Sequence, residues 1–156
     1  MKKTALVIAT LLFVCKFGFA QLSFEVVEEK LPYSHWATSY TTNIIGYGQD
    51  FVLQKWQNHI GELGGKTYVE SMHRGNIELR SENVKFPILN DEKVTIYTRL
   101  KPNSTLTGVM ITLWIQTKDG TYFSTQTHPE EAKKMKKWMM EFNVNLKKQN
   151  QKIIYN

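Results

Sequence analysis

The stretch that decides the fold is Thr107–Leu146, TGVMITLWIQTKDGTYFSTQTHPEEAKKMKKWMMEFNVNL. Its first part alternates two sets of side chains, which is typical of a strand with one face in a core. The apolar set is Val109, Ile111, Leu113 and Ile115, and the set on the reverse face is Met110, Thr112, Trp114 and Gln116. The Asp119-Gly120 pair then predicts a two-residue type I′ hairpin with a short returning strand.

A helix closes this stretch. Proline suits the first turn of a helix, where its missing N–H would have no partner, so Pro129 marks the start. Thr127 and Glu130 have the spacing of a capping box. The helix carries an apolar stripe that matches the strand, made of Ala132, Met135, Trp138, Met139, Phe142 and Leu146. This stripe predicts that the helix packs on the apolar face of the strand.

The first 20 residues have the three parts of a secretory signal peptide. Lys2 and Lys3 give a positive start, and residues 5–14 form an apolar run that is too short to span a bilayer. Ala20 then supplies a small residue before the cleavage point. We therefore predict export, with cleavage near Ala20, to the periplasm or the extracellular space.

Cleavage would leave residues 21–156 as a single α+β domain. Removing 20 of the 156 residues leaves 136, a length that buries roughly two-thirds of the surface of the unfolded chain. The only cysteine, Cys15, precedes the cut, so the mature chain has no disulfide and no thiolate for metal binding or catalysis. Its 17 basic and 14 acidic residues give a net charge of +3, which argues against a nucleic-acid partner. No second apolar segment predicts a transmembrane helix.

Six strands and two helices are predicted in the mature chain. The first helix is expected to be capped by Asp50, to turn Leu53, Trp56, Ile60 and Leu63 inward, and to end at Gly64-Gly65. The strands are expected at residues 22–29, 36–45, 66–72, 76–85, 93–101 and 107–116. The predicted fold class is α+β, an antiparallel sheet of about six strands with helices packed on one face, in the order β-β-α-β-β-β-β-α.

No sequence pattern names a reaction. The chain has no G-x-S-x-G elbow, no P-loop and no G-x-G-x-x-G, and its four histidines lack metal-ligand spacing. We therefore predict no catalytic residues, no metal and no cofactor. An alternative prediction is a small hydrolase or lyase in which His128 or His59 works with a carboxylate.

The reverse face of the long strand is the predicted binding surface. Tyr97 and Arg99 of the preceding strand are expected beside Met110 and Trp114. Aromatic side chains, methionine and arginine are enriched on recognition surfaces, and aromatics with an arginine can bind a sugar or an anion. The competing interpretation is that this face is covered by the first two strands.

The lysines of the last helix suggest a third function. Lys133, Lys134 and Lys137 fall opposite its apolar stripe, where they could contact anionic lipid weakly. A solvated helix face is the commoner explanation for such a run.

Several short motifs occur in one order along the mature chain. They are Glu28-Glu29-Lys30-Leu31-Pro32, Trp56, Gly64-Gly65-Lys66, Val94-Thr95-Ile96-Tyr97, Leu113-Trp114-Ile115, Tyr122-Phe123-Ser124 and His128-Pro129-Glu130. In these motifs the chain resembles an uncharacterised group of small exported bacterial proteins of unknown function. The resemblance implies export and a shared fold, and it implies no activity. Our leading prediction is therefore an exported, non-enzymatic domain that binds a small ligand or an envelope protein.

Overall fold

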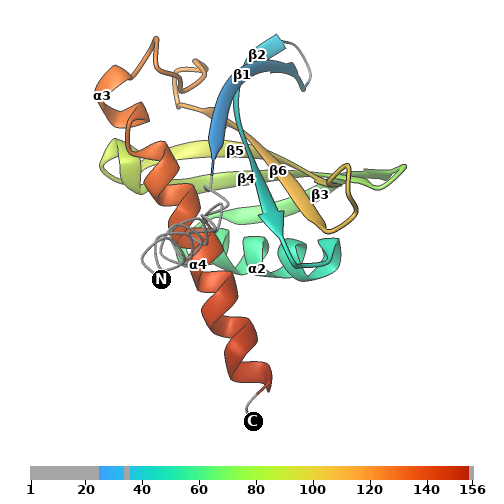
Figure 1. Cartoon of the computed structure of the whole chain (residues 1–156). Helices are drawn as coiled ribbons and strands as arrows, with labels where there is room; N and C mark the ends of the chain where they lie inside the picture. The colour runs from blue at the N-terminus through green and yellow to red at the C-terminus, as the bar shows by residue number, and fades with distance from the viewer. Residues whose placement is uncertain (1–24, 34–35, 155–156) are drawn as a thin grey trace, which may run out of the picture.

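The computed structural model describes residues 25–33 and 36–154 (Figure 1). The predicted signal peptide, residues 1–20, lies outside the described residues. The strands are β1 (Val26–Pro32), β2 (Trp36–Ile45), β3 (Lys66–His73), β4 (Asn76–Phe86), β5 (Glu92–Pro102) and β6 (Gly108–Gln116). The helices are α2 (Gln49–Glu62), the 3₁₀ turn η1 (Pro87–Leu89), α3 (Pro129–Ala132) and α4 (Met135–Ile154).

The six strands form one antiparallel sheet in the order β1-β2-β6-β5-β4-β3. β3 to β6 follow one another as a meander, and the β1–β2 hairpin joins the sheet through β2 against β6. The long strand β6 therefore lies between β2 and β5, inside the sheet. Because β6 is hydrogen-bonded to a strand on each side, its side chains have cross-strand neighbours on both β2 and β5.

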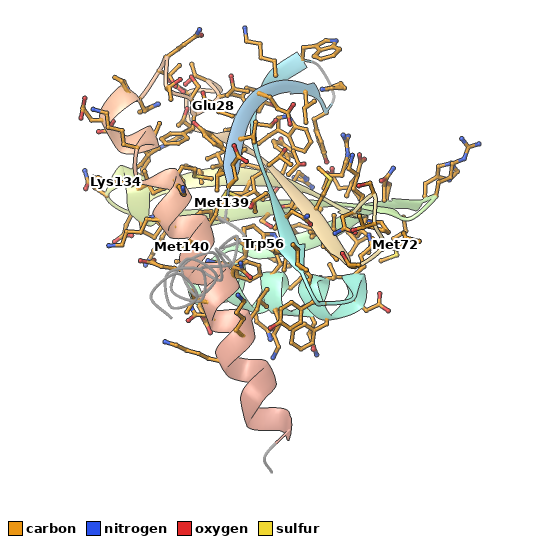
Figure 2. The ribbon with its side chains drawn as sticks, in the orientation of Figure 1. Glu28, Trp56, Met72, Lys134, Met139 and Met140 are labelled. Carbon is orange, nitrogen blue, oxygen red and sulfur yellow. The ribbon has the colours of Figure 1, made fainter. Side chains whose placement is uncertain are left out.

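Both long helices pack on one face of the sheet (Figure 1). Figure 2 shows Trp56 of α2 and Met139 of α4 directed into the core between the helices and the strands. The Trp56 ring makes edge contacts with Trp138 and Phe142, with ring centroids 6.0 and 5.1 Å apart. Its indole N–H donates to the Thr98 hydroxyl at 3.0 Å, so the one polar atom of this side chain is satisfied inside the core.

The predicted fold class is confirmed, including the order of strands and helices. Every member of the two predicted apolar sets is buried, on β6 and on the last helix. In α2, Trp56 and Ile60 are buried as predicted, Val52 is also fully buried, and Leu53 and Leu63 are only partly buried.

The predicted hairpin at Asp119-Gly120 was wrong in type. A type I′ turn needs positive φ at both central residues, and only Gly120 has it. The Asp119 carboxylate instead accepts hydrogen bonds from the Thr117 hydroxyl and from the backbone N–H and hydroxyl of Thr121. The returning strand shrinks to a single bridge between Gln116 and Tyr122.

A turn with positive φ at both central residues occurs between β3 and β4. Arg74 and Gly75 have φ of 49° and 77°, and His73 pairs with Asn76 on either side of them. This is the conformation that a two-residue type I′ hairpin requires.

The predicted capping by side chains was also wrong. No side-chain hydrogen bond caps α2 or α3, which begin after Gly48 and His128. The Thr127 hydroxyl bonds instead within the preceding loop, where it accepts from the Ser124 N–H and donates to the Tyr122 carbonyl. The last helix is also broken into α3 and α4, because Lys133 and Lys134 form a turn between them.

Candidate functional site

Three of the four predicted ligand-binding residues meet on the reverse face. Tyr97 of β5 pairs with Trp114 of β6, and Arg99 pairs with the neighbouring Thr112. Tyr33, which follows β1, covers them and completes what we call the aromatic cluster: Tyr33, Tyr97, Arg99 and Trp114. The centroid of the Tyr33 ring lies 4.8 Å from that of Tyr97 and 5.3 Å from that of Trp114.

Trp114 is fully buried, with 0% of its surface exposed. Its indole N–H donates to the Leu31 carbonyl at 3.2 Å. The guanidinium carbon of Arg99 lies 5.0 Å from the ring centroid, in cation–π contact. The competing interpretation was that the first two strands cover this face. Trp114 is instead covered by the chain at the end of β1, and its ring has no exposed surface.

Arg99 is held in place by several partners at once. Its Nε donates to the Glu78 carboxylate at 2.9 Å, and its Nη2 lies 2.7 Å from the same oxygen. Nη2 also donates to the Pro32 carbonyl at 3.2 Å. These donors are therefore committed to the fold and are not presented to a ligand.

Met110 lies apart from the aromatic cluster. It is four residues from Trp114 along β6, about 13 Å at the usual rise per residue. Its cross-strand neighbours are Asn43 and Lys101, at the other end of the reverse face.

Tyr33 joins the two edge strands across the reverse face. Its hydroxyl donates to the Glu70 carboxylate in β3, at the opposite edge of the sheet from β1. Five strand spacings, about 24 Å in a flat sheet, separate β1 from β3. The contact therefore requires the sheet to curl around the reverse face. Burial, and then the hydrogen bond to Glu70, raises the pKa of Tyr33 well above its ordinary value of 10.0.

Ion pairs occupy the β3–β4 side of this face. Arg80 donates to Glu70 at 2.8 Å and pairs with Glu82, and its guanidinium lies 5.4 Å from the ring centroid of Tyr68. The hydrogen bond to Glu70 raises the pKa of Arg80. Charges that satisfy one another in this way leave little free hydrogen-bonding capacity for a partner.

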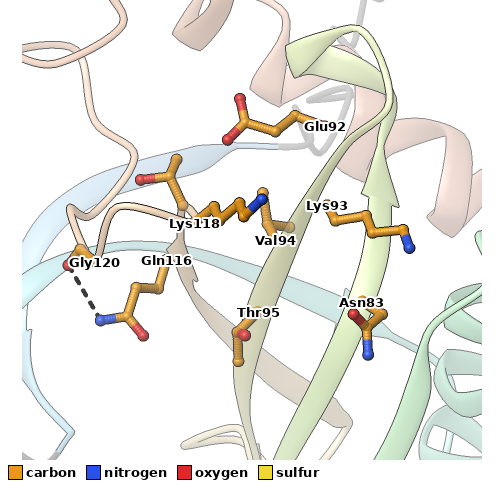
Figure 3. A pocket seen from close by; sticks show the side chains of 9 residues that line it. Asn83, Glu92, Lys93, Val94, Thr95, Gln116, Lys118 and Gly120 are labelled. Carbon is orange, nitrogen blue, oxygen red and sulfur yellow. Dashed lines mark hydrogen bonds between the residues drawn. The ribbon is translucent and has the colours of Figure 1, made fainter.

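The open part of the reverse face is a hollow of about 700 Å³ at the end where β5 and β6 separate (Figure 3). We call it the polar hollow. Its lining residues are Asn83, Glu92, Lys93, Val94, Thr95, Gln116, Thr117, Lys118 and Gly120. In Figure 3, Gln116 and Lys118 lie on one side of it, and Lys93 and Asn83 lie on the other. It adjoins the aromatic cluster, since the Tyr97 hydroxyl lies 3.4 Å from the Gln116 amide oxygen.

Two irregularities of the sheet create the polar hollow. Pairing between β5 and β6 begins only at Thr95 and Gln116, because the Thr117 N–H bonds to the Thr121 carbonyl and turns the chain away. The backbone of residues 92–94 therefore has β4 on one side and no partner strand on the other. A β-bulge in β4 then places Asn83, with φ of 58°, opposite this region.

Most polar side chains of the hollow have no partner among the described residues. Lys93, Lys118 and Glu92 form none of the ion pairs found there, and Asn83 and Thr95 make no side-chain hydrogen bond there. The amide nitrogen of Gln116 donates to the Gly120 carbonyl at 3.1 Å. Beside the ion pairs of Arg80 and Arg99, this is a concentration of free donors and acceptors.

A second hollow of about 330 Å³ adjoins the first and contains His128. Glu92, Asp119, Thr117 and Lys118 also line it. The His128 ring stacks on Phe123, and its Nδ1 lies 2.9 Å from the Thr127 hydroxyl. Hydrogen bonds from Thr117 and Thr121 lower the pKa of Asp119 to about 2, so this carboxylate stays ionised. It is therefore unsuited to act as a general acid.

His59 lies among aromatic rings between α2 and α4. Its ring centroid is 5.7 Å from that of Trp138 and 5.3 Å from that of Phe142. Burial lowers its pKa, and its Nε2 has no hydrogen-bond partner among the described residues. The adjoining hollow, about 30 Å³, is too small for a substrate. Within residues 25–33 and 36–148, neither His59 nor His128 is bonded to a carboxylate.

Two of the three lysines predicted to contact lipid have a glutamate partner three or four residues away in the sequence. Lys133 pairs with Glu130 at 2.7 Å and Lys137 lies 4.0 Å from Glu141, while Lys134 is exposed. Among the described helices, none is both long and apolar enough to cross a bilayer. The described residues also contain no group of three or more metal-ligating side chains.

Comparison of the chain with protein families, with curated proteins and with solved structures finds no match. The resemblance to small exported bacterial proteins stays a prediction.

Sequence reasoning missed Tyr33, Lys93, Lys118 and Asn83. Tyr33 lies outside any predicted strand, and its contact with Glu70 joins positions 37 residues apart. The Lys118-Asp119-Gly120 turn was a visible signal that β6 ends there. Nothing in the sequence pattern marked the bulge at Asn83, because a bulge is one extra residue in an otherwise alternating strand.

Proposed function

We propose that the chain is an exported, non-enzymatic domain that binds a small polar ligand on the helix-free side of its sheet. The observation that carries this proposal is the polar hollow. It combines a volume of about 700 Å³ with free side chains that have both donor and acceptor groups. This volume falls within the range of small-molecule sites.

The proposed site differs from the one expected from the sequence. The aromatic cluster supports the ligand site from beside it, because Trp114 and Arg99 are occupied by contacts within the fold. Tyr97 is the one predicted residue that lies at the edge of the hollow, through its contact with Gln116. We assign Lys93, Thr95, Gln116 and Lys118 as the residues that face the ligand.

Filling the hollow without changing its charge tests the proposal. Thr95 is half-buried on β5 and lines the hollow, so Thr95→Trp should occupy the space while keeping a residue that suits a strand. The matched control is Lys101→Trp, on the same face of the same strand but at its opposite end. The protein should be recovered from the periplasm of a bacterial host, where its mass should be that of residues 21–156.

Thermal unfolding would be measured with neutral sugars, amino acids, dicarboxylates, sugar phosphates and short peptides. We expect at least one compound to raise the unfolding midpoint of the wild type and of Lys101→Trp, and not that of Thr95→Trp. Ligand at 100 times its dissociation constant adds about 2.7 kcal/mol, which shifts the midpoint by several degrees. A shift that persists in Thr95→Trp, or no shift with any compound, would contradict the proposal.

The same samples separate binding from catalysis. The bound compound would be incubated with the protein and followed by proton NMR. An unchanged spectrum supports a binding protein, and conversion of the compound would establish the hydrolase or lyase alternative.

A further inference from the structure

We infer that the polar hollow binds an oxyanion, the phosphate or carboxylate group of a small hydroxyl-bearing molecule. This inference rests on the proposed function and adds the chemical class of the ligand. Two lysines and one glutamate line the hollow, and neither lysine is paired with a carboxylate of the described chain.

The two lysines belong to opposite sides of the hollow. Lys118 extends from the turn after β6 toward Val94, and Lys93 lies on β5 with its ammonium group directed away from Lys118 (Figure 3). The flexible Lys93 side chain can turn toward an anion that Lys118 binds, and each ammonium group has three donors. Charge-assisted hydrogen bonds of this kind are roughly twice as strong as neutral ones.

A like-charge pair next to the hollow supports the same conclusion. Lys93 of β5 stands directly opposite Lys85 of β4, in a cross-strand pair. Side chains in such pairs have Cβ atoms about 4.5–5.5 Å apart, and like charges at that distance are destabilising. Neither lysine has an acidic partner among the described ion pairs, so a bound anion would relieve this repulsion.

The acidic groups nearby do not supply that anion. Glu82 is engaged by Arg80, and Asp119 accepts its hydrogen bonds from Thr117 and Thr121. Glu92 lines the hollow but forms no ion pair with either lysine. Its carboxylate is suited to accept hydrogen bonds from the hydroxyl groups of a ligand, as are the amide oxygens of Asn83 and Gln116.

Four probes that differ in charge test the inference by isothermal titration: inorganic phosphate, glucose 6-phosphate, glucuronate and glucose. We expect the three anions to bind and glucose to bind at least tenfold more weakly. Lys93→Ala and Lys118→Ala should each weaken the anions about tenfold, because each removes a charge-assisted contact. Lys101→Ala, which removes a lysine from the same strand outside the hollow, should leave affinity unchanged. Raising the salt concentration should weaken the anions.

Vesicles distinguish a lipid headgroup from a free oxyanion. In one outcome, the protein binds phosphatidylglycerol vesicles through Lys118, and binds neither phosphatidylcholine vesicles nor the free probes. That result would support the oxyanion chemistry and assign it to a membrane surface. Equal binding of glucose and glucose 6-phosphate would overturn the oxyanion and leave the ligand-binding function standing. The oxyanion would also be overturned if Lys93→Ala and Lys118→Ala bind a ligand with wild-type affinity while Thr95→Trp does not bind it. If none of the three anions and neither kind of vesicle binds, the oxyanion inference is overturned. The proposed ligand-binding function is overturned only if, in addition, no compound of the thermal-unfolding panel gives a midpoint shift that Thr95→Trp removes.

Discussion

The aromatic cluster and the polar hollow are neighbours on one sheet face, but the side chains of the cluster are bonded within the fold and the lysines of the hollow are not. In the cluster, Trp114 is fully covered and Arg99 has a carboxylate and a carbonyl as partners. In the hollow, Lys93 and Lys118 have no such partners among the described residues. The difference teaches that residue types common on recognition surfaces can serve the fold, while the plainer lysines beside them are left free for a ligand.

Removing the central ring of the cluster should have the largest effect on stability. Trp114→Ala deletes a fully buried side chain together with its hydrogen bond to Leu31, so it should lower the free energy of unfolding by about 3–5 kcal/mol. Urea denaturation measures this change. The matched control is Trp36→Ala, because Trp36 is 70% exposed and its loss should cost within about 0.5 kcal/mol. A loss below about 1 kcal/mol for Trp114→Ala would show that the cluster is not a packed unit.

Breaking the contact between the two sheet edges should have a smaller effect that depends on pH. Tyr33→Phe removes the hydrogen bond to Glu70 and should lower the free energy of unfolding by about 1 kcal/mol near pH 8. The folded protein holds Tyr33 as the neutral phenol, so its contribution is present below the ordinary tyrosine pKa of 10.0 and falls as pH rises above it.

The gap between wild type and Tyr33→Phe should therefore narrow between pH 9 and pH 11. Urea titrations at several pH values measure it, and using the difference cancels the other tyrosines. A gap that stays constant across this range would mean that Tyr33 ionises as freely in the folded protein as in the unfolded chain.

The smallest effect is expected in the hollow. Lys93→Ala removes one member of the Lys85–Lys93 pair, so the free energy of unfolding should stay within about 0.5 kcal/mol of wild type and should rise, not fall. Added salt should erase the gain, because it screens exposed charges. Lys101→Ala is the control, with no gain expected. A loss above about 1 kcal/mol would show that Lys93 supports the fold in the way Arg99 does.

Local pattern was sufficient for the order of the strands and helices and for the apolar core residues of β6 and the last helix. The alternation from Val109 to Ile115 and the apolar stripe of the last helix correctly predicted that these apolar side chains are buried, because a strand and a helix each impose a fixed period on the chain. The same pattern correctly placed Tyr97, Arg99 and Trp114 on the reverse face. The pattern could not predict whether other parts of the chain cover that face, since alternation shows only which side chains share a face of the strand.

What covers the reverse face was decided by tertiary structure alone. The cover is Tyr33, which reaches Trp114 and Glu70 only because the sheet curls and brings its edges together. The polar hollow likewise depends on where β6 leaves β5 and on the bulge at Asn83, two departures from regular pairing. The stretch Thr107–Leu146 by itself determined a core strand and its helix. Contacts with residues far away in the sequence cover Trp114, so the candidate site lies at the end of that strand and not at Trp114.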